Sequence, residues 1–179
     1  YNLTGEGVGV VVVDSGVNAE AWDLRDPVTS ITRVKYAEDF SGSGSTRDDF
    51  GHGTHVAGII AGNAYYSTGS WVAHQIKGIA PKAHLISLKV LNASGVGYDS
   101  GVIAAINRAI TLKATRPDLK IRVMNLSLGR GVFKNYYNDP LCQAVAAAWN
   151  AGITVVVAAG NHGRNNTSGI DGYGTITAP

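Results

Sequence analysis

Residues 10–14 read Val-Val-Val-Val-Asp, and they are the strongest indication of the fold class. Four consecutive β-branched residues without polar alternation predict a strand buried on both faces, as the strands of a parallel sheet are. Three further runs of this character follow at residues 84–90, 121–126 and 153–157. Segments of helical spacing lie between the runs, so strand and helix alternate along the chain. This alternation predicts an α/β fold with a mainly parallel sheet.

Three segments carry apolar residues at helical spacing. The first follows Thr54, the second lies around residues 102–110, and the third spans Pro140–Asn150. Their apolar residues are Val56, Ile59 and Ile60, then Val102, Ile103, Ile106 and Ile110, then Leu141, Ala144, Val145, Ala148 and Trp149. Residues 41–45, Ser-Gly-Ser-Gly-Ser, predict a flexible surface turn, and residues 160–174 predict a long loop after the last strand.

Composition limits the class of protein. The 179 residues suffice for one domain with a sizeable core, and 16% charged residues with 45% hydrophobic residues exclude intrinsic disorder. A net charge of +2 gives no electrostatic case for a nucleic acid partner. No apolar run approaches the ~20 residues of a membrane span, so no membrane is expected as a partner. The single cysteine excludes an internal disulfide and a zinc site built from cysteines.

Three polar residues fall where a parallel α/β sheet places its active site, beyond the carboxyl ends of the strands. Asp14 ends the first run, His52 opens the first helix, and Asn161 follows the last run. Each alone has an ordinary explanation as a turn or capping residue. Together they suggest an acyl-transfer site, with His52 as general base, Asp14 fixing its tautomer and Asn161 donating to an oxyanion. This hypothesis predicts that the His52 ring nitrogen that faces away from the cleft donates a hydrogen bond to the Asp14 carboxylate.

Four segments resemble the successive signatures of the subtilisin-like serine proteases, in the order of that family. They are Asp-Ser-Gly-Val at 14–17, Gly-His-Gly-Thr-His-Val-Ala-Gly at 51–58, Asn-Leu-Ser-Leu-Gly at 125–129 and Ala-Gly-Asn-His-Gly at 159–163. The resemblance implies a subtilisin-like three-layer fold and a secreted, extracellular serine endopeptidase. It also implies Asp14 and His52 as two members of the catalytic triad and Asn161 as the side-chain donor of the oxyanion hole.

The sequence departs from the family at the nucleophile. The family's serine lies in a Gly-Thr-Ser-Met-Ala motif that opens a later helix, whereas the two Gly-Thr pairs here lead to His55 and Ile176. We therefore expect residues 1–179 to form a single incomplete peptidase domain, truncated before the nucleophile helix and inactive alone. The expected partners are an extended polypeptide substrate and either the missing C-terminal segment or a second copy, which would cover an exposed sheet edge.

The resemblance places the substrate contacts in glycine-rich segments. Gly95, Val96 and Gly97 would pair with an extended peptide by strand addition. The walls of the primary specificity pocket would be Ser127, Leu128 and Gly129 on one side and Ala158, Ala159 and Gly160 on the other. These walls are small and uncharged, so large apolar residues are expected there rather than Lys or Arg. An ordinary turn is the alternative explanation for each glycine-rich stretch.

The resemblance suggests one bound metal, calcium. Asp23, nine residues after Asp14, matches a calcium-ligating position of many family members. A calcium ion needs about six or more oxygen ligands, and residues 63–77 offer few suitable side chains. A solvated surface aspartate is therefore an equal alternative, and structural calcium stays open. No cofactor is required for the expected chemistry.

Other functions fit parts of the sequence. Gly5-Glu6-Gly7-Val8-Gly9 suggests a dinucleotide site, but these glycines precede the strand, whereas pyrophosphate binding needs them after it. His52 and His55 suggest a zinc hydrolase, but the helical motif of that class spaces its histidines i, i+4 with a glutamate between them. A domain that grips peptides without cleaving them stays open, since the nucleophile motif is absent from the sequence.

Overall fold

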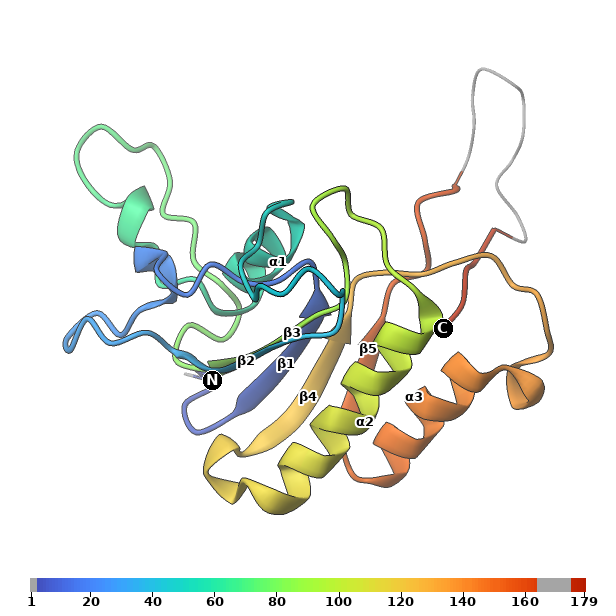
Figure 1. Ribbon diagram of the computed structural model, residues 1–179. Coiled ribbons are helices and arrows are strands. Elements are labelled where there is room, and N and C mark those ends of the chain that lie inside the picture. The colour runs from blue at the N-terminus through green and yellow to red at the C-terminus, as the bar shows by residue number, and fades with distance from the viewer. Residues whose placement is uncertain (1–2, 164–174) are drawn as a thin grey trace.

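A five-stranded sheet organises the part of the chain that the structure describes, residues 3–163 and 175–179 of a computed structural model (Figure 1). Its strands are β1 (Gly9–Asp14), β2 (Val34–Asp39), β3 (His84–Lys89), β4 (Ile121–Leu126) and β5 (Thr154–Val157). They lie in the order β2-β3-β1-β4-β5, and every neighbouring pair is parallel. The predicted α/β class with a mainly parallel sheet is confirmed, with β1 at the centre.

Helices cover both faces of the sheet, which gives the three predicted layers (Figure 1). α1 (His52–Ala61) lies on one face, and α2 (Asp99–Thr115) and α3 (Pro140–Asn150) lie on the other. β1 contributes core residues on both faces of the sheet. Val11 and Val13 pack in the hydrophobic cluster with α2 and α3, whereas Val10 and Val12 pack in the cluster with α1. Short 3-10 helices in the connections are η1 (Trp22–Leu24), η2 (Tyr65–Ser67), η3 (Pro117–Leu119) and η4 (Tyr136–Asn138). Within the described residues, no helix is long and apolar enough to cross a bilayer.

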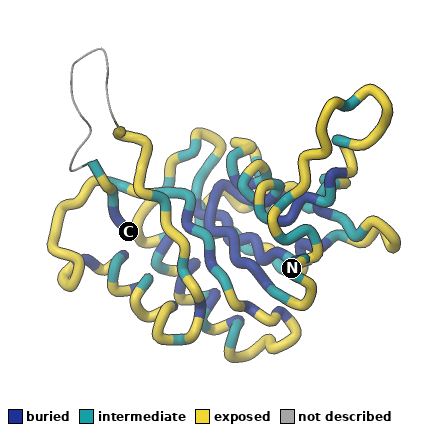
Figure 2. Tube along the Cα trace, turned by 180° about the vertical axis from the view of Figure 1, so that it is seen from behind, coloured by how far each residue is buried: buried dark blue, intermediate teal, exposed yellow. Residues whose placement is uncertain are grey.

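Burial is greatest in the central strands and least in β5 (Figure 2). β1 and β3 are buried along nearly their whole length, as predicted. The prediction of two buried faces is wrong for β4 and β5: Arg122 of β4 is exposed, and Val156 and Val157 of β5 are 50% and 43% exposed. The reason is that α1 contacts β1 and β3, while β5 pairs only with β4 among the described residues. Trp149 of α3 is likewise exposed rather than part of the core.

α1 packs on the sheet through its smallest residues. The buried residues of the helix are Gly53, Ala57 and Ala61. Of the apolar residues that share a face of this helix, Ile59 is 57% exposed and lies outside the core. The physical reason is the close approach of the helix to the sheet, since a Cβ on Gly53 would lie 2.1 Å from the Gly16 carbonyl oxygen. Only glycine lets the two backbones meet at this distance, and the alanines at 57 and 61 keep the rest of the helix close to the sheet.

The apolar pattern of the sequence does not predict β2. It carries charged residues at Lys35, Glu38 and Asp39, which break the apolar pattern of the other strands. β2 lies at an edge of the sheet, where charged side chains reach solvent and discourage pairing with other chains. At the other end of the chain, most of the long loop predicted at residues 160–174 lies outside the described residues.

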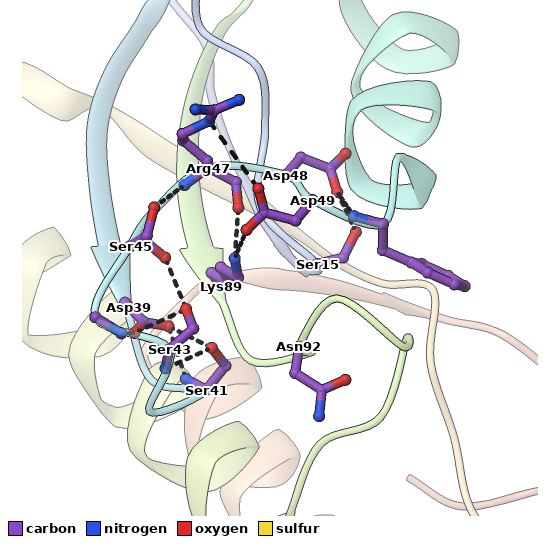
Figure 3. A network of polar contacts seen from close by, with 12 residues as sticks. Ser15, Asp39, Ser41, Ser43, Ser45, Arg47, Asp48, Asp49, Lys89 and Asn92 are labelled. Carbon is purple, nitrogen blue, oxygen red and sulfur yellow. Dashed lines mark hydrogen bonds and ion pairs between the residues drawn. The ribbon is translucent and has the colours of Figure 1, made fainter.

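Asp39 fixes the surface turn predicted at residues 41–45 (Figure 3). Its carboxylate accepts hydrogen bonds from Ser41 N at 2.9 Å, from Ser43 Oγ at 3.3 Å and from Gly44 N at 2.8 Å. Burial raises the pKa of Asp39, but these hydrogen bonds outweigh burial and hold the pKa below its ordinary value. The turn is therefore organised by the last side chain of β2.

Gly53 gives a direct test of the packing of α1. Gly53→Ala should lower the free energy of unfolding by about 2–3 kcal/mol, because the new methyl group would meet a backbone carbonyl rather than a flexible side chain. Gly58 is the matched control, since a Cβ there meets nothing within 4 Å. Gly58→Ala should instead raise the free energy of unfolding by about 0.5–1 kcal/mol through helix propensity. Urea unfolding measures both, and equal effects would show that close packing at Gly53 is not the constraint.

Candidate active site

Asp14 and His52 meet where β1 ends and α1 begins. His52 Nδ1 lies 2.8 Å from Asp14 Oδ1 and 3.0 Å from Asp14 Oδ2, so the hydrogen bond predicted between them is present. Asp14 is fully buried, and its Oδ1 also accepts a hydrogen bond from Ser15 N at 2.7 Å. The His52 side chain is 41% exposed and lines a cleft. Nε2 is therefore the ring nitrogen that remains for a reacting group.

Asp48 connects the residue after β1 to the first turn of α1 (Figure 3). Its Oδ1 accepts from Ser15 Oγ at 2.8 Å and from Gly51 N at 2.7 Å, and its Oδ2 accepts from Thr54 N at 2.7 Å. Ser15 Oγ in turn accepts from Gly53 N at 2.9 Å. Gly51 is the N-cap of α1 and has no side chain, so Asp48 satisfies the N–H group that a capping side chain would otherwise bind. Burial raises the pKa of Asp48, but the hydrogen bonds outweigh burial and lower it.

A buried lysine supports the loop that precedes α1. Lys89 lies beside Asp14 in the parallel register of β3 and β1, and it is fully buried. Its ammonium donates to Arg47 O at 2.5 Å and to Asp49 Oδ2 at 3.2 Å (Figure 3). Because a buried ammonium without partners is costly, these contacts hold residues 47–49 over the end of the sheet, directly ahead of His52.

A cleft of about 360 Å³ opens beside His52. Phe50 and Tyr98 contribute aromatic rings to its lining. Two of the predicted substrate segments also line it, namely Gly95, Val96 and Gly97, and Ser127, Leu128 and Gly129. The structure therefore brings His52 together with segments that follow β3 and β4.

Asn92 shapes the first of these segments into a turn. Asn92 N donates to Val96 O at 2.9 Å, and Asn92 Oδ1 accepts from Val96 N at 3.1 Å. Gly95 has a φ of +72°, a conformation in which glycine is favoured. The turn that is the alternative explanation for this segment is thus present at its start. Within the described residues, Gly97 forms no hydrogen bond through its backbone N–H or C=O, so Gly97 rather than Val96 has backbone groups available to a peptide.

The second predicted wall of the specificity pocket does not line this cleft. Ala158, Ala159 and Gly160 are separated from Gly129 by Thr177, which the sequence analysis did not identify. A Cβ on Gly129 would meet Thr177 Oγ1 at 2.6 Å, and a Cβ on Gly160 would meet Thr177 Cγ2 at 2.8 Å. Thr177 N donates to Ala159 O at 3.1 Å, while its Oγ1 is buried without a hydrogen-bond partner among the described residues. Thr177 therefore lies between the two predicted walls.

Arg130 joins the N-termini of α2 and α3 beside the cleft. It donates to Asp99 at 2.7 Å and to both carboxylate oxygens of Asp139 at 2.8 and 2.7 Å. Asp139 caps α3 by accepting from Leu141 N at 2.9 Å, and the hydrogen bond from Arg130 is the main reason that its pKa lies below the ordinary value. Asp99 is the sole carboxylate that lines the cleft within the described part of the chain, and Arg130 neutralises it.

Asn161 and Asp23 lie outside this cleft. Asn161 is exposed in the bend after β5, and its role as an oxyanion donor stays a prediction. Asp23 lies in η1 and is half-buried. In residues 3–163 and 175–179, no group of three or more His, Cys, Asp or Glu side chains is placed to hold a metal ion. The zinc alternative built on His52 and His55 therefore finds no ligand set there.

The fold and the Asp14–His52 couple define an α/β domain with an acid–base pair at the carboxyl end of its central strand. Comparison with known proteins refines this class. Residues 5–177 match the model of the Subtilase family, and the chain belongs to that family.

Individual relatives agree with the family assignment. The chain is 39% identical over 163 residues to serine protease AprX of Bacillus subtilis (strain 168) and 38% identical over 175 residues to subtilisin-like protease 4 of Trichophyton equinum. These alignments cover 90% and 98% of this chain but 34% and 37% of the relatives, so the chain spans about a third of their length.

Solved structures give the same result for the fold. Sphericase has a TM-score of 0.71 at 36% identity, with 96% of this chain and 51% of sphericase covered. A cold-adapted subtilisin-like serine proteinase has a TM-score of 0.68 at 31% identity, with 90% of this chain and 49% of that chain covered. The chain therefore has the subtilisin-like fold over about half the length of these structures.

Asp48→Asn tests the capping role of Asp48. It should lower the free energy of unfolding at neutral pH by about 2 kcal/mol, because an amide group replaces an oxygen that accepts backbone N–H groups. The pKa of Asp48 is lower in the folded protein than in the unfolded chain, so its contribution is present above about pH 4 and is lost as pH falls through the folded pKa. The difference between wild type and variant should therefore shrink in acid.

Asp118→Asn is the control for this measurement. Asp118 also has a lowered pKa, chiefly because Arg116 donates a hydrogen bond to it, but it is exposed, so its replacement should change stability little. Thermal unfolding of the three proteins between about pH 3 and pH 7 gives the comparison. A difference that stays constant with pH, or one as large for Asp118→Asn, would refute the capping role.

Proposed function

We propose that the protein is a serine endopeptidase in which Asp14 and His52 form the acid–base part of a catalytic triad. The observation that carries the proposal is the Asp14–His52 hydrogen bond at the edge of a cleft lined by segments suited to a peptide. In such a triad the buried carboxylate keeps the proton of the neutral ring on Nδ1 and stabilises the imidazolium that forms when Nε2 accepts a proton. Membership of the Subtilase family supports this role.

The nucleophilic serine is proposed to come from outside these 179 residues, since they contain no Gly-Thr-Ser sequence. The serine oxygen would bond to the substrate carbonyl carbon as its proton passes to His52 Nε2, and His52 would then give that proton to the leaving amine. Asn161 is proposed to donate its side-chain amide to the oxyanion. Residues 1–179 alone would therefore lack peptidase activity, and the exposed edge of β5 would meet the remainder of the domain or a second copy.

An extended polypeptide is the proposed substrate. Gly97 offers backbone groups for strand addition, and residues 127–129 line the same cleft. Because Arg130 neutralises the carboxylate of Asp99, a Lys or Arg side chain would lose its hydration in the cleft without gaining a partner. We therefore propose a preference for large apolar or aromatic residues before the cleaved bond. No cofactor is proposed for the chemistry, and the protein is proposed to be extracellular, as the family resemblance implies.

A domain that binds peptides without cleaving them is the second candidate. The absence of the Gly-Thr-Ser sequence favours it, because a binding domain needs the cleft but not the nucleophile. The two candidates share the peptide-binding segments and differ only in hydrolysis.

Hydrolysis of fluorogenic extended peptides by the protein as the cell makes it tests the proposal. Asp14→Asn should lower kcat about 10⁴-fold, which is the loss seen in the general serine-protease triad when the histidine takes the wrong tautomer. Peptides with Phe or Leu before the cleaved bond should react at least ~10-fold faster than those with Lys or Arg. Asp118→Asn, an exposed change in η3, is the control and should keep the wild-type rate.

Two results would count against the proposal. Full activity in Asp14→Asn would remove Asp14 from the triad, and a profile dominated by Lys or Arg would show that the pocket lies elsewhere. Binding of the same peptides by the wild type with no cleavage would favour the second candidate.

A further inference from the structure

Arg33 is a buried cation outside the candidate active site. It directly precedes β2 and is 6% exposed. Its guanidinium donates four hydrogen bonds, and every acceptor is a backbone carbonyl oxygen. The acceptors are Asp23 O at 2.9 Å, Arg25 O at 3.3 Å, Ala61 O at 2.5 Å and Ala83 O at 2.8 Å. Arg33 is therefore surrounded by oxygens of the main chain.

These carbonyls belong to segments that are distant in the sequence. Asp23 lies in η1, Ala61 is the last residue of α1, and Ala83 directly precedes β3. The last carbonyls of a helix have no partner within the helix and carry partial negative charge. The last turn of α1 contains no basic residue of its own. Arg33 therefore supplies the positive charge at the C-terminus of α1 and joins that end to η1 and to the start of β3.

Asn63 donates to two of the carbonyls that Arg33 binds and to one neighbouring carbonyl. Asn63 N donates to Asp23 O at 2.9 Å, and its side-chain amide donates to Trp22 O at 3.0 Å and to Arg25 O at 2.8 Å. Its own Oδ1 accepts from Tyr65 N at 2.8 Å. The main-chain oxygens around Asp23 are therefore engaged by N–H donors.

We infer that the Arg33 guanidinium is the resident cation of this carbonyl cluster, and that Asp23 does not form a calcium site. Calcium takes about six to eight oxygen ligands, which come from carboxylates, main-chain and side-chain carbonyls and waters. Here the carbonyls near Asp23 already receive N–H groups, and the described residues hold no acidic cluster to replace them. A calcium ion would also have to approach a buried positive charge. The expectation of calcium at Asp23 therefore does not fit these residues.

The shape of the guanidinium suits it to this place. It holds five N–H donors in fixed directions within one plane, so it can serve several carbonyls at once, whereas a lysine ammonium is a point charge with three donors. Burial lowers the pKa of Arg33 below its ordinary value. The negative charges of Asp26 and Asp23 offset only part of that lowering. Asp26 and Asp23 thus place negative charge near the Arg33 guanidinium.

Thermal unfolding in excess calcium chloride and in excess EDTA tests the inference on the protein as the cell makes it. The measurement is the gain in Tm that calcium gives over EDTA, in the wild type and in Asp23→Asn. The two gains should be equal, because a calcium site elsewhere in the protein contributes the same amount to both. A gain in the wild type that Asp23→Asn abolishes would overturn the inference.

Replacement of Arg33 tests the second part of the inference, that the Arg33 guanidinium is the cation of the carbonyl cluster. Arg33→Met should lower Tm by roughly 5–10 °C, because the buried carbonyls of Ala61 and Ala83 lose the Arg33 donor and those of Asp23 and Arg25 keep only Asn63. Arg33→Lys should lower Tm by less, since it keeps the charge but not the planar donors. Arg122→Met, on the exposed side of β4, is the matched control and should shift Tm by less than about 2 °C. If Arg33→Met fails to fold, the shift in Tm is measured with Arg33→Lys instead. Arg33 variants as stable as the Arg122→Met control would overturn the inference.

Discussion

The first turn of α1 rests directly on the end of β1, and the candidate active site depends on that contact. Because Gly53 has no side chain, the helix approaches closely enough for the buried Asp14 carboxylate to reach Nδ1 of His52. Two polar groups maintain this approach. Asp48 binds N–H groups at the start of the helix, and Lys89 holds the loop that leads into it. A helix start displaced by the width of a methyl group would separate carboxylate and imidazole.

The parallel sheet accounts for the position of the cleft. Strands β1, β3 and β4 are neighbours, and their carboxyl ends lead to Asp14, to the turn at residues 92–95 and to residues 127–129. The same helix that carries His52 is held at its other end by Arg33. α1 thus has a carboxylate at its N-terminus and a guanidinium at its C-terminus, and each charge has the sign that the helix dipole favours.

Much of this fold could be predicted, because β1, β3 and α3 show local apolar patterns that do not depend on distant contacts. β2 could not, since its charged residues suit an edge strand. The buried face of α1 could not either, because it consists of Gly53, Ala57 and Ala61 rather than of the large apolar residues that mark the helix in the sequence. Asp14 and His52 could be predicted from their positions at the ends of elements. Asp48, Lys89 and Thr177 could not, because their roles arise from contacts between segments distant in sequence.

Asp14 is proposed to hold the neutral ring of His52 with its proton on Nδ1, and this tautomer can be measured without any assay of activity. Nitrogen-15 NMR of the His52 imidazole, at a pH where the ring is neutral, distinguishes the protonated nitrogen from the bare one. We expect Nδ1 to carry the proton in the wild type, and Asp14→Asn to move the population toward protonation at Nε2. A wild-type ring protonated at Nε2, or a tautomer that Asp14→Asn leaves unchanged, would contradict the role given to Asp14.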